Sequence, residues 1–275
     1  MRILDFHFHA GTRSHWTPWV IDFFQKNNPA YYDNFLDVIT PEKVLEYLDG
    51  QGVEKAVVLS EYAPACTGVV TNEFTSEFCS KSDRLIPFGS VCLHDGIAPA
   101  EQADRALREL GVRGFKMLPT YAHFYPNDPN LFPFYEVLRD AHVPVQFHTG
   151  TSVFRGSRIK YGDPLLLDDV ADAFPTLQIV LDHGGRPFWY DRAAWMLLRH
   201  ANVHIGITGI PAKQLLTHFP KLESFPDRFL FGSDWPGAGD IGPLVEKVSA
   251  LPLRSSTIEA ILWDNGARLL SLDSF

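Results

Sequence analysis

Short apolar segments recur along the whole chain, and each is long enough to form one buried strand. The stretches between them carry polar and apolar residues at helical spacing. Such alternation is typical of parallel strands joined by helical crossovers. We count eight apolar segments, at 2–9, 55–60, 85–91, 113–118, 143–148, 178–183, 203–208 and 228–233.

The helical stretches have recognisable ends. Thr40 suits the N-cap and Pro41 the first turn of one helix, and Gly111 follows the last periodic residue of another. Eight strand–helix units predict an α/β fold, a single (β/α)8 TIM barrel. A doubly wound parallel sheet is the alternative, but no glycine-rich phosphate-binding turn follows the first segment. No linker-like stretch divides the chain, so we expect one domain over residues 1–275.

Composition narrows the classes of partner. The 275 residues carry a formal net charge of −9, which argues against nucleic acid, because a phosphate backbone favours a basic surface. No apolar run is long enough to span a membrane, and the first residues lack the pattern of a signal peptide. The three cysteines have no paired spacing. We therefore expect a cytoplasmic protein with reduced thiols that acts on a small molecule, as a monomer or a homo-oligomer.

The first predicted strand carries a polar face in the stretch DFHFH. Alternate residues of an extended strand share a face, so Asp5, His7 and His9 are expected to point one way and Phe6 and Phe8 the other. Two imidazoles on one face can hold one divalent ion between them. Asp5, one step deeper, is expected either to orient a ligand imidazole or to accept hydrogen bonds from the backbone.

Further histidines and a carboxylate follow other predicted strands. His148 ends the fifth segment, His183 ends the sixth, and Asp234 follows the eighth. In a (β/α)8 barrel the carboxyl ends of all strands meet at one face, where active sites lie. Taken singly, each residue has the alternative of a turn histidine or a helix-capping carboxylate. Together they predict a metal site, since imidazole and carboxylate suit a borderline ion such as Zn²⁺.

Four motifs in this order, DFHFH, FHTG, DHGGRP and FGSDWP, resemble the amidohydrolase superfamily. More narrowly, they resemble its amidohydrolase-2 branch, which includes the aminocarboxymuconate-semialdehyde decarboxylase-like enzymes. The resemblance covers nearly the whole chain and implies a barrel that holds one divalent ion. From the ligand types we expect Zn²⁺, with Mn²⁺ or Mg²⁺ as alternatives. The resemblance would make His7, His9, His148 and Asp234 the ligands and His183 a catalytic residue close to the metal-bound water.

Lys116, near the end of the fourth predicted strand, leaves the number of ions open. Binuclear members of the superfamily bridge two ions with a carboxylated lysine on this strand, and both His148 and His183 would then bind the second ion. We expect one ion, because the surrounding motifs resemble the mononuclear branch. In that case Lys116 reaches either the substrate or a neighbouring carboxylate.

Two segments at the predicted rim bear on the substrate. Residues 15–35 are rich in aromatic side chains and form a local core, a dimer contact or a substrate lid, the last favouring a planar or apolar substrate. Basic residues follow the fifth and sixth strands, where an arginine fork could grip a carboxylate, and solvated surface charge is the alternative. The candidate substrate-binding residues are Lys116, Arg155, Arg158, Arg186 and Trp16, with Lys160 in the same basic loop.

These features predict a metal-dependent hydrolase acting on a small, carboxylated molecule through a metal-activated water. Asp234 would be the general base, and His183 would position or polarise the substrate. The alternative is a metal-dependent, non-oxidative decarboxylase of an aromatic or muconate-type acid, in which His183 would help to handle the proton. A third class is a barrel that binds without catalysis, although such a protein is expected to have lost at least one ligand.

Overall fold

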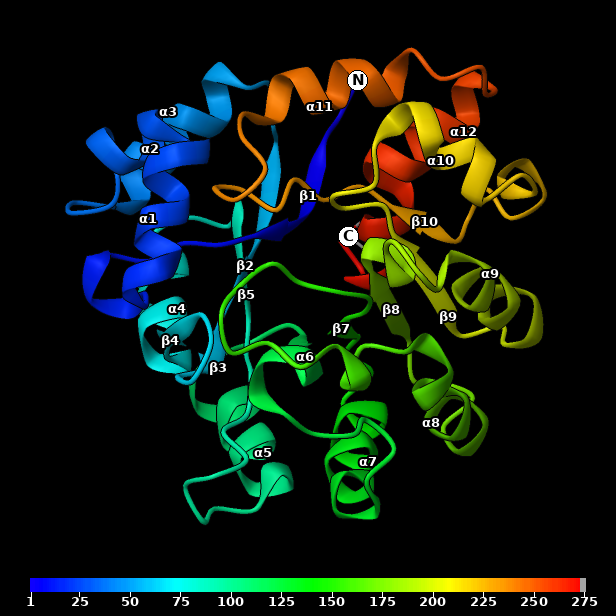
Figure 1. The fold of residues 1–275 in the computed structure, drawn as a ribbon, viewed down its shortest axis with the longest axis horizontal. Helices are drawn as coiled ribbons and strands as arrows, with labels where there is room; N and C mark the ends of the chain where they lie inside the picture. The colour runs from blue at the N-terminus through cyan, green and yellow to red at the C-terminus, as the bar shows by residue number, and fades with distance from the viewer. Residues whose placement is uncertain (273–275) are drawn as a thin grey trace.

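Parallel strands form a closed ring in the structure, a computed structural model that describes residues 1–272. Each of the eight predicted segments contains one strand, and hydrogen bonding gives the runs β1-β2-β5 and β6-β7-β8-β9-β10. Parallel bridges from Gly89 to Phe115 and from Phe8 to Trp235 join the runs into a barrel (Figure 1). The eight strands are β1 (Leu4–Phe8), β2 (Lys55–Leu59), β5 (Leu85–Phe88), β6 (Phe115–Met117), β7 (Val145–His148), β8 (Ile179–Asp182), β9 (Val203–Gly206) and β10 (Phe229–Leu230).

Helices surround this ring, as Figure 1 shows, so the predicted (β/α)8 barrel is confirmed and the doubly wound alternative is excluded. Among the described residues, none of the helices has the length and apolarity needed to cross a bilayer. The helices are α1 (Pro18–Asn27), α2 (Pro29–Asn34), α3 (Pro41–Gly50), α4 (Asn72–Cys79), α5 (Pro99–Glu109), α6 (Pro119–Ala122), α7 (Phe132–Asp140), α8 (Asp168–Ala173), α9 (Tyr190–Arg199), α10 (Ala212–His218), α11 (Ile241–Ser249), α12 (Ser255–Glu259) and α13 (Asn265–Leu269).

Two apolar layers hold the barrel together. The outer layer packs the helices against the outward side chains of the strands, for example Phe115 and Met117 of β6. The inner layer joins side chains of opposite strands and is closed at one end by α13. Its buried members are Leu4, Phe6, Val57, Leu59, Ile86, Phe88, Val180, Leu230, Trp263, Ala267, Leu269 and Leu270.

β1 departs from the simple alternation that its sequence predicts. Its register against β2 shifts between Asp5 and Phe8. Phe6 packs in the inner layer, whereas Phe8 packs outside, stacked on Trp235 with ring centroids 4.5 Å apart. The prediction that Phe6 and Phe8 share a face is therefore wrong. The prediction that Asp5 shares a face with His7 and His9 is also wrong, because Asp5 lies between the inward Leu4 and Phe6. Its carboxylate accepts bonds from the backbone N–H groups of His7 and Ser233, which is the backbone alternative.

The segment after β1 and a short hairpin add to the barrel's rim. The aromatic residues of 15–35 form α1 and α2, where Phe24 and Tyr31 are buried in the outer layer, so the expected local core is present. The antiparallel hairpin of β3 (Glu61–Ala63) and β4 (Gly68–Val70) was not predicted. The cysteines Cys66, Cys79 and Cys92 are free, as expected.

Candidate active site

Three ligand atoms from the two ends of the chain converge at the barrel's mouth. His7 Nε2 lies 3.1 Å from His9 Nε2 and 3.3 Å from Asp234 Oδ1, and His9 Nε2 lies 3.6 Å from the same oxygen. The backbone N–H of Asp234 donates to the His7 carbonyl, which fixes the two segments side by side. Asp234 has a φ of +61°, a left-handed conformation that is uncommon outside glycine and clusters at functional sites.

The other ring nitrogens of the two histidines face buried carboxylates. His7 Nδ1 lies 3.3 Å from Asp182 Oδ2, and His9 Nδ1 lies 3.5 Å from Glu61 Oε2. Both contacts are longer than an ideal hydrogen bond, yet the Asp182 carboxylate favours a proton on His7 Nδ1 and leaves His7 Nε2 free. Metal-binding histidines usually have such a partner behind the ring. Neither Asp182 nor Glu61 was among the predicted site residues.

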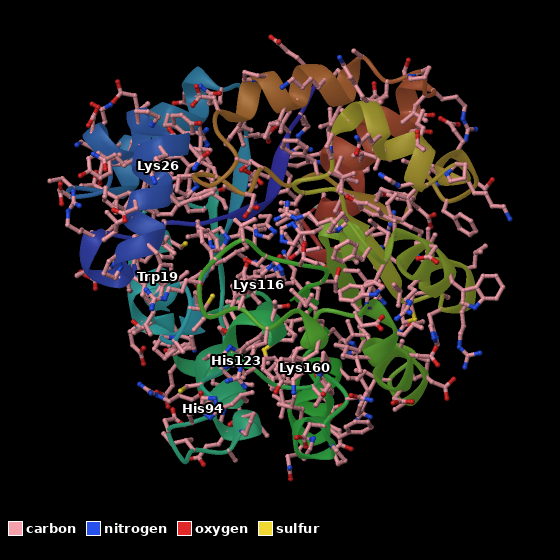
Figure 2. All side chains as sticks on the ribbon, in the orientation of Figure 1. Trp19, Lys26, His94, Lys116, His123 and Lys160 are labelled. Atoms are coloured by element: carbon pink, nitrogen blue, oxygen red, sulfur yellow. The ribbon has the colours of Figure 1, made fainter. Side chains whose placement is uncertain are left out.

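Lys116 forms an ion pair with Asp182 inside the barrel. Both side chains are fully buried, and Figure 2 shows Lys116 near the middle of the ring of strands. Gly206 makes room for this pair, since a Cβ at that position would collide with the Asp182 carboxylate. Lys116 lines the cavity, but its ammonium is engaged by a neighbouring carboxylate, which is the second of the two predicted alternatives.

His148 and His183 stand beside the three converging atoms. Their ring centroids are 4.6 Å apart, and His183 lies 5.2 Å from His7. His183 Nδ1 lies 3.0 Å from the Thr208 carbonyl, so it carries the proton and Nε2 is the free nitrogen. Among the described residues, the group whose ligand atoms all lie within 4.8 Å of one another is His7, His9 and Asp234, so His148 stands outside it.

The protonation states in the pocket suit a divalent cation. Burial lowers the pKa of His148 and His183 well below the usual value, so both rings are neutral. Burial would raise the pKa of Asp234, but hydrogen bonds from His7 and His9 outweigh it and hold that pKa well below the usual range. Burial also lowers the pKa of His9. Neutral imidazoles and an ionised carboxylate are the states that a metal ligand needs, so the donor set fits one ion.

The pKa values of two further ionisable groups, His7 and Glu61, are shifted upward. Burial and the Lys116 ammonium lower the pKa of His7, but the nearby Asp182 and Asp234 carboxylates outweigh them and the net shift is upward. Burial raises the pKa of Glu61 to about 8, so this carboxyl group is mostly protonated at neutral pH.

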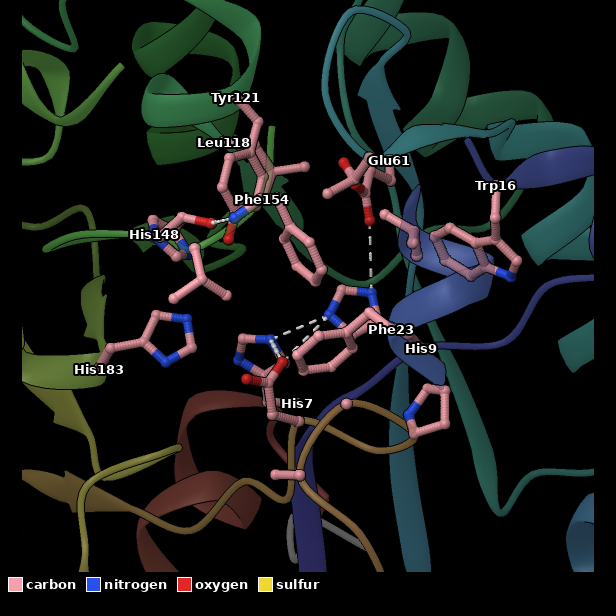
Figure 3. A pocket seen from close by; sticks show the side chains of 18 of the residues that line it. His7, His9, Trp16, Phe23, Glu61, Leu118, Tyr121, His148, Phe154 and His183 are labelled. Carbon is pink, nitrogen blue, oxygen red and sulfur yellow. Dashed lines mark hydrogen bonds and ion pairs between the residues drawn. The ribbon is translucent and has the colours of Figure 1, made fainter. Parts of the chain in front are cut away.

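The histidines lie at the floor of a cavity of about 270 Å³. That volume is close to the lower limit of about 300 Å³ for small-molecule pockets, and it suits a molecule of about one ring. Arg186 reaches the floor from the side, with Nη2 3.7 Å from Asp234 Oδ2. Figure 3 shows the aromatic walls above the histidines, and the large apolar and aromatic lining residues are Trp16, Val20, Phe23, Phe24, Leu118, Tyr121 and Phe154.

The predicted substrate-binding residues divide into two groups. Trp16, Lys116 and Arg186 line the cavity. Arg155 and Arg158 are exposed and lie outside it, and Arg155 packs over the Trp19 ring, 5.6 Å from its centroid.

The course of the basic loop explains this outcome. Gly156 has a φ of +89°, and a Cβ there would collide with the Ala65 carbonyl, so the chain turns sharply against that backbone. Phe154 therefore lines the cavity, while the basic side chains face solvent. Lys160 lies over the Tyr161 ring, 4.7 Å from its centroid. The alternative of ordinary surface charge fits these loop residues.

Comparison with known proteins gives the family. A family model described as amidohydrolase matches residues 4–272, and the chain therefore belongs to the amidohydrolase family of enzymes. A curated relative, the gamma-resorcylate decarboxylase of Rhizobium sp. (strain MTP-10005), is 27% identical over 248 residues, which cover 70% of this chain and 75% of that protein.

Solved structures agree with the fold. An uncharacterised TIM-barrel protein from Bordetella bronchiseptica matches with a TM-score of 0.81 over 100% of both chains, at 24% identity. The 5-carboxyvanillate decarboxylase of Novosphingobium aromaticivorans DSM 12444 was solved with manganese and 4-hydroxy-3-methoxy-5-nitrobenzoic acid. It matches with a TM-score of 0.70 over 98% of this chain and 96% of that chain, at 17% identity.

Proposed function

We propose that this protein is a metal-dependent, non-oxidative decarboxylase of small hydroxylated aromatic acids. The observation that carries the proposal is the convergence of His7, His9 and Asp234 at the floor of a cavity with aromatic walls. The sequence alone favours hydrolysis, with decarboxylation as the alternative. The named relatives, which act on gamma-resorcylate and 5-carboxyvanillate, favour the second.

His7, His9 and Asp234 would hold the ion, and His148, whose Nε2 lies 3.3 Å from the Thr151 carbonyl, would turn from that contact to become a fourth ligand. We propose one ion per chain, either manganese, which is present in the structure of one relative, or zinc, which suits these ligands. When bound, a divalent ion supplies positive charge that draws the acid's oxygens to the floor. Arg186 adds a second cationic group there, since its guanidinium lies beside Asp234.

His183 would move the proton. Its neutral Nε2 can take the proton of a ring hydroxyl next to the carboxylate and return it to the ring carbon that bears the carboxylate. The carbon–carbon bond then breaks, and its electron pair enters the ring and restores the phenolate oxygen. CO2 leaves, and the phenolate takes one proton from solvent.

The proposal is tested with protein loaded with Mn²⁺ or Zn²⁺. We expect CO2 release from 2,6-dihydroxybenzoate and related hydroxybenzoates, and none from benzoate, which lacks the hydroxyl group. A matched panel of esters, lactones and amides tests the hydrolase alternative in the same preparations. Turnover of any of these with no CO2 from the acids would restore the hydrolase, and no reaction in either panel would contradict catalysis on these substrate classes.

A further inference from the structure

The charges of the cavity are confined to its floor. Apart from the Tyr121 phenol, the ionisable side chains that line it are His7, His9, Glu61, Lys116, His148, His183, Arg186 and Asp234. Apart from Lys116 and Arg186, none of these is a lysine or arginine, and Lys116 is neutralised by Asp182. Arg186 lies within 3.7 Å of Asp234. The cations that could meet an acid are therefore gathered at one end.

Two partly exposed phenylalanines line the same cavity. Phe23 comes from α1 and Phe154 from the loop after β7, and their ring centroids are 5.0 Å apart with the planes at 74°. Both are partly exposed, whereas His7, His148 and His183 below them are buried. Figure 3 shows the two rings side by side in the cavity. Phe154 also contacts the Tyr121 ring, 6.2 Å away, which supports its position.

We infer that the pocket selects monoanionic aromatic acids, and that Phe23 and Phe154 are the specificity-determining residues. The inference rests on the proposed function and names its substrate class. An acid held by its carboxylate at the floor directs the opposite edge of its ring toward these two phenylalanines. A methyl group or hydrogen there gains apolar contact. A second carboxylate there would lose water to two phenyl rings and find no free cation, because the lining cations, Lys116 and Arg186, pair with Asp182 and Asp234.

Arg155 is the nearest candidate for a missing partner, because it follows Phe154 in the chain. Its guanidinium is held over the Trp19 ring outside the cavity, and Trp19 is itself fixed by a hydrogen bond from its indole N–H to the Cys66 carbonyl at 2.6 Å. Arg155 is therefore not expected to accept a second carboxylate.

The test uses three acids that lack a ring hydroxyl and remain intact: benzoate, 4-methylbenzoate and terephthalate. Their dissociation constants are measured by calorimetry on the Mn²⁺-loaded protein at neutral pH. We expect 4-methylbenzoate to bind within about tenfold of benzoate. Terephthalate is expected to bind at least about a hundredfold more weakly, because its second carboxylate meets the two phenyl rings without a cationic partner.

Variants locate the selectivity. Phe154→Lys supplies the missing cation and is expected to strengthen terephthalate binding at least about tenfold while weakening 4-methylbenzoate. Phe23→Lys, on the other wall, is the second variant and is expected to act in the same direction. Ile159→Lys adds the same charge to the loop outside the cavity, and Arg155→Ala removes the adjacent cation. Both controls are expected to leave the ratio of the two constants unchanged.

Terephthalate binding within threefold of benzoate in the wild type would overturn the inference, as would failure of all three acids to bind. A selective loss of terephthalate binding in Arg155→Ala would overturn it too, because that arginine would then be the partner. Because these binding constants are measured without turnover, their outcome does not depend on whether the protein is a decarboxylase. Selectivity as expected, with no CO2 from hydroxybenzoates, would refute the decarboxylase and leave the preference for monoanionic acids standing.

Discussion

Replacing Asp182 by asparagine separates metal binding from substrate chemistry. The side chain keeps its shape but loses the charge that faces both His7 Nδ1 and the Lys116 ammonium. An amide can present its NH2 group to His7 as readily as its oxygen, so the ring is no longer held with Nε2 toward the other ligands. Lys116 is left in the barrel interior without a counter-ion.

Two magnitudes follow from these contacts. Loss of the carboxylate behind a metal-binding histidine typically weakens metal affinity by roughly 10- to 100-fold. Breaking a buried ion pair by removing one partner costs roughly 3–5 kcal/mol. For a chain of this size each kcal/mol lowers the melting temperature by about 2–4 °C, so we expect a drop of roughly 6–20 °C in the metal-free protein.

Metal affinity is measured by competition with a chelator for Mn²⁺ and Zn²⁺, and stability by thermal unfolding without metal. Asp168→Asn is the matched control, because that carboxylate contacts Arg199 and His200 outside the cavity. It is expected to leave metal affinity unchanged. A folded Asp182→Asn protein that binds both ions as tightly as the wild type would refute the idea that Asp182 orients His7.

Four further outcomes are expected. His183→Ala keeps the ion but loses roughly 10²–10⁴ in turnover, whereas His148→Ala also loses metal affinity; metal loss in the first variant, seen by elemental analysis, would place His183 on the ion. Elemental analysis and mass spectrometry of the wild type should find about one ion per chain and an unmodified Lys116, and two ions with a carboxylated lysine would contradict this. Arg186→Ala is expected to raise KM for an acid substrate by roughly 10- to 100-fold and to leave the binding of its neutral amide unchanged. If inhibition assays show that the variant binds acid and amide equally more weakly, a charge contact is excluded. Burial raises the pKa of Glu61 to about 8. The native metal-free protein therefore keeps a proton that the unfolded chain releases above about pH 4.5. Between pH 4.5 and 8 this group makes the free energy of unfolding fall as pH rises. Denaturant titrations should show that Glu61→Gln lacks this part of the slope, and an unchanged slope would mean that Glu61 is ionised in the native state.

The strands could be predicted from the sequence because each is an apolar run buried on both faces. Their ends could not. The predicted segment 85–91 holds a strand only over Leu85–Phe88, and 228–233 only over Phe229–Leu230. The residues that follow are still apolar or small, but they leave the hydrogen-bonded ladder to form the rim. A one-dimensional pattern records burial, and burial continues past the point where pairing stops.

The converging residues of the site were recognisable for a similar reason. His7, His9 and Asp234 are polar side chains where an apolar strand is expected to continue. Asp182 has the same pattern, since it follows the inward Val180 by two residues. It was not predicted as a site residue, because the neighbouring His183 was assigned to the site instead. Glu61 had no local signal, because its contact with His9 depends on how the unpredicted hairpin sits on the barrel.

The closure of the barrel also sets the order in which the site is completed during synthesis. β1 receives hydrogen bonds from, and donates them to, the segment 231–235, so the first strand waits for almost the last part of the chain before it gains its second neighbour. A ribosome-bound chain that ends before β10 presents His7 and His9 without Asp234. Such a nascent chain offers only a weak two-nitrogen site, and tight metal capture is deferred until the ring can close.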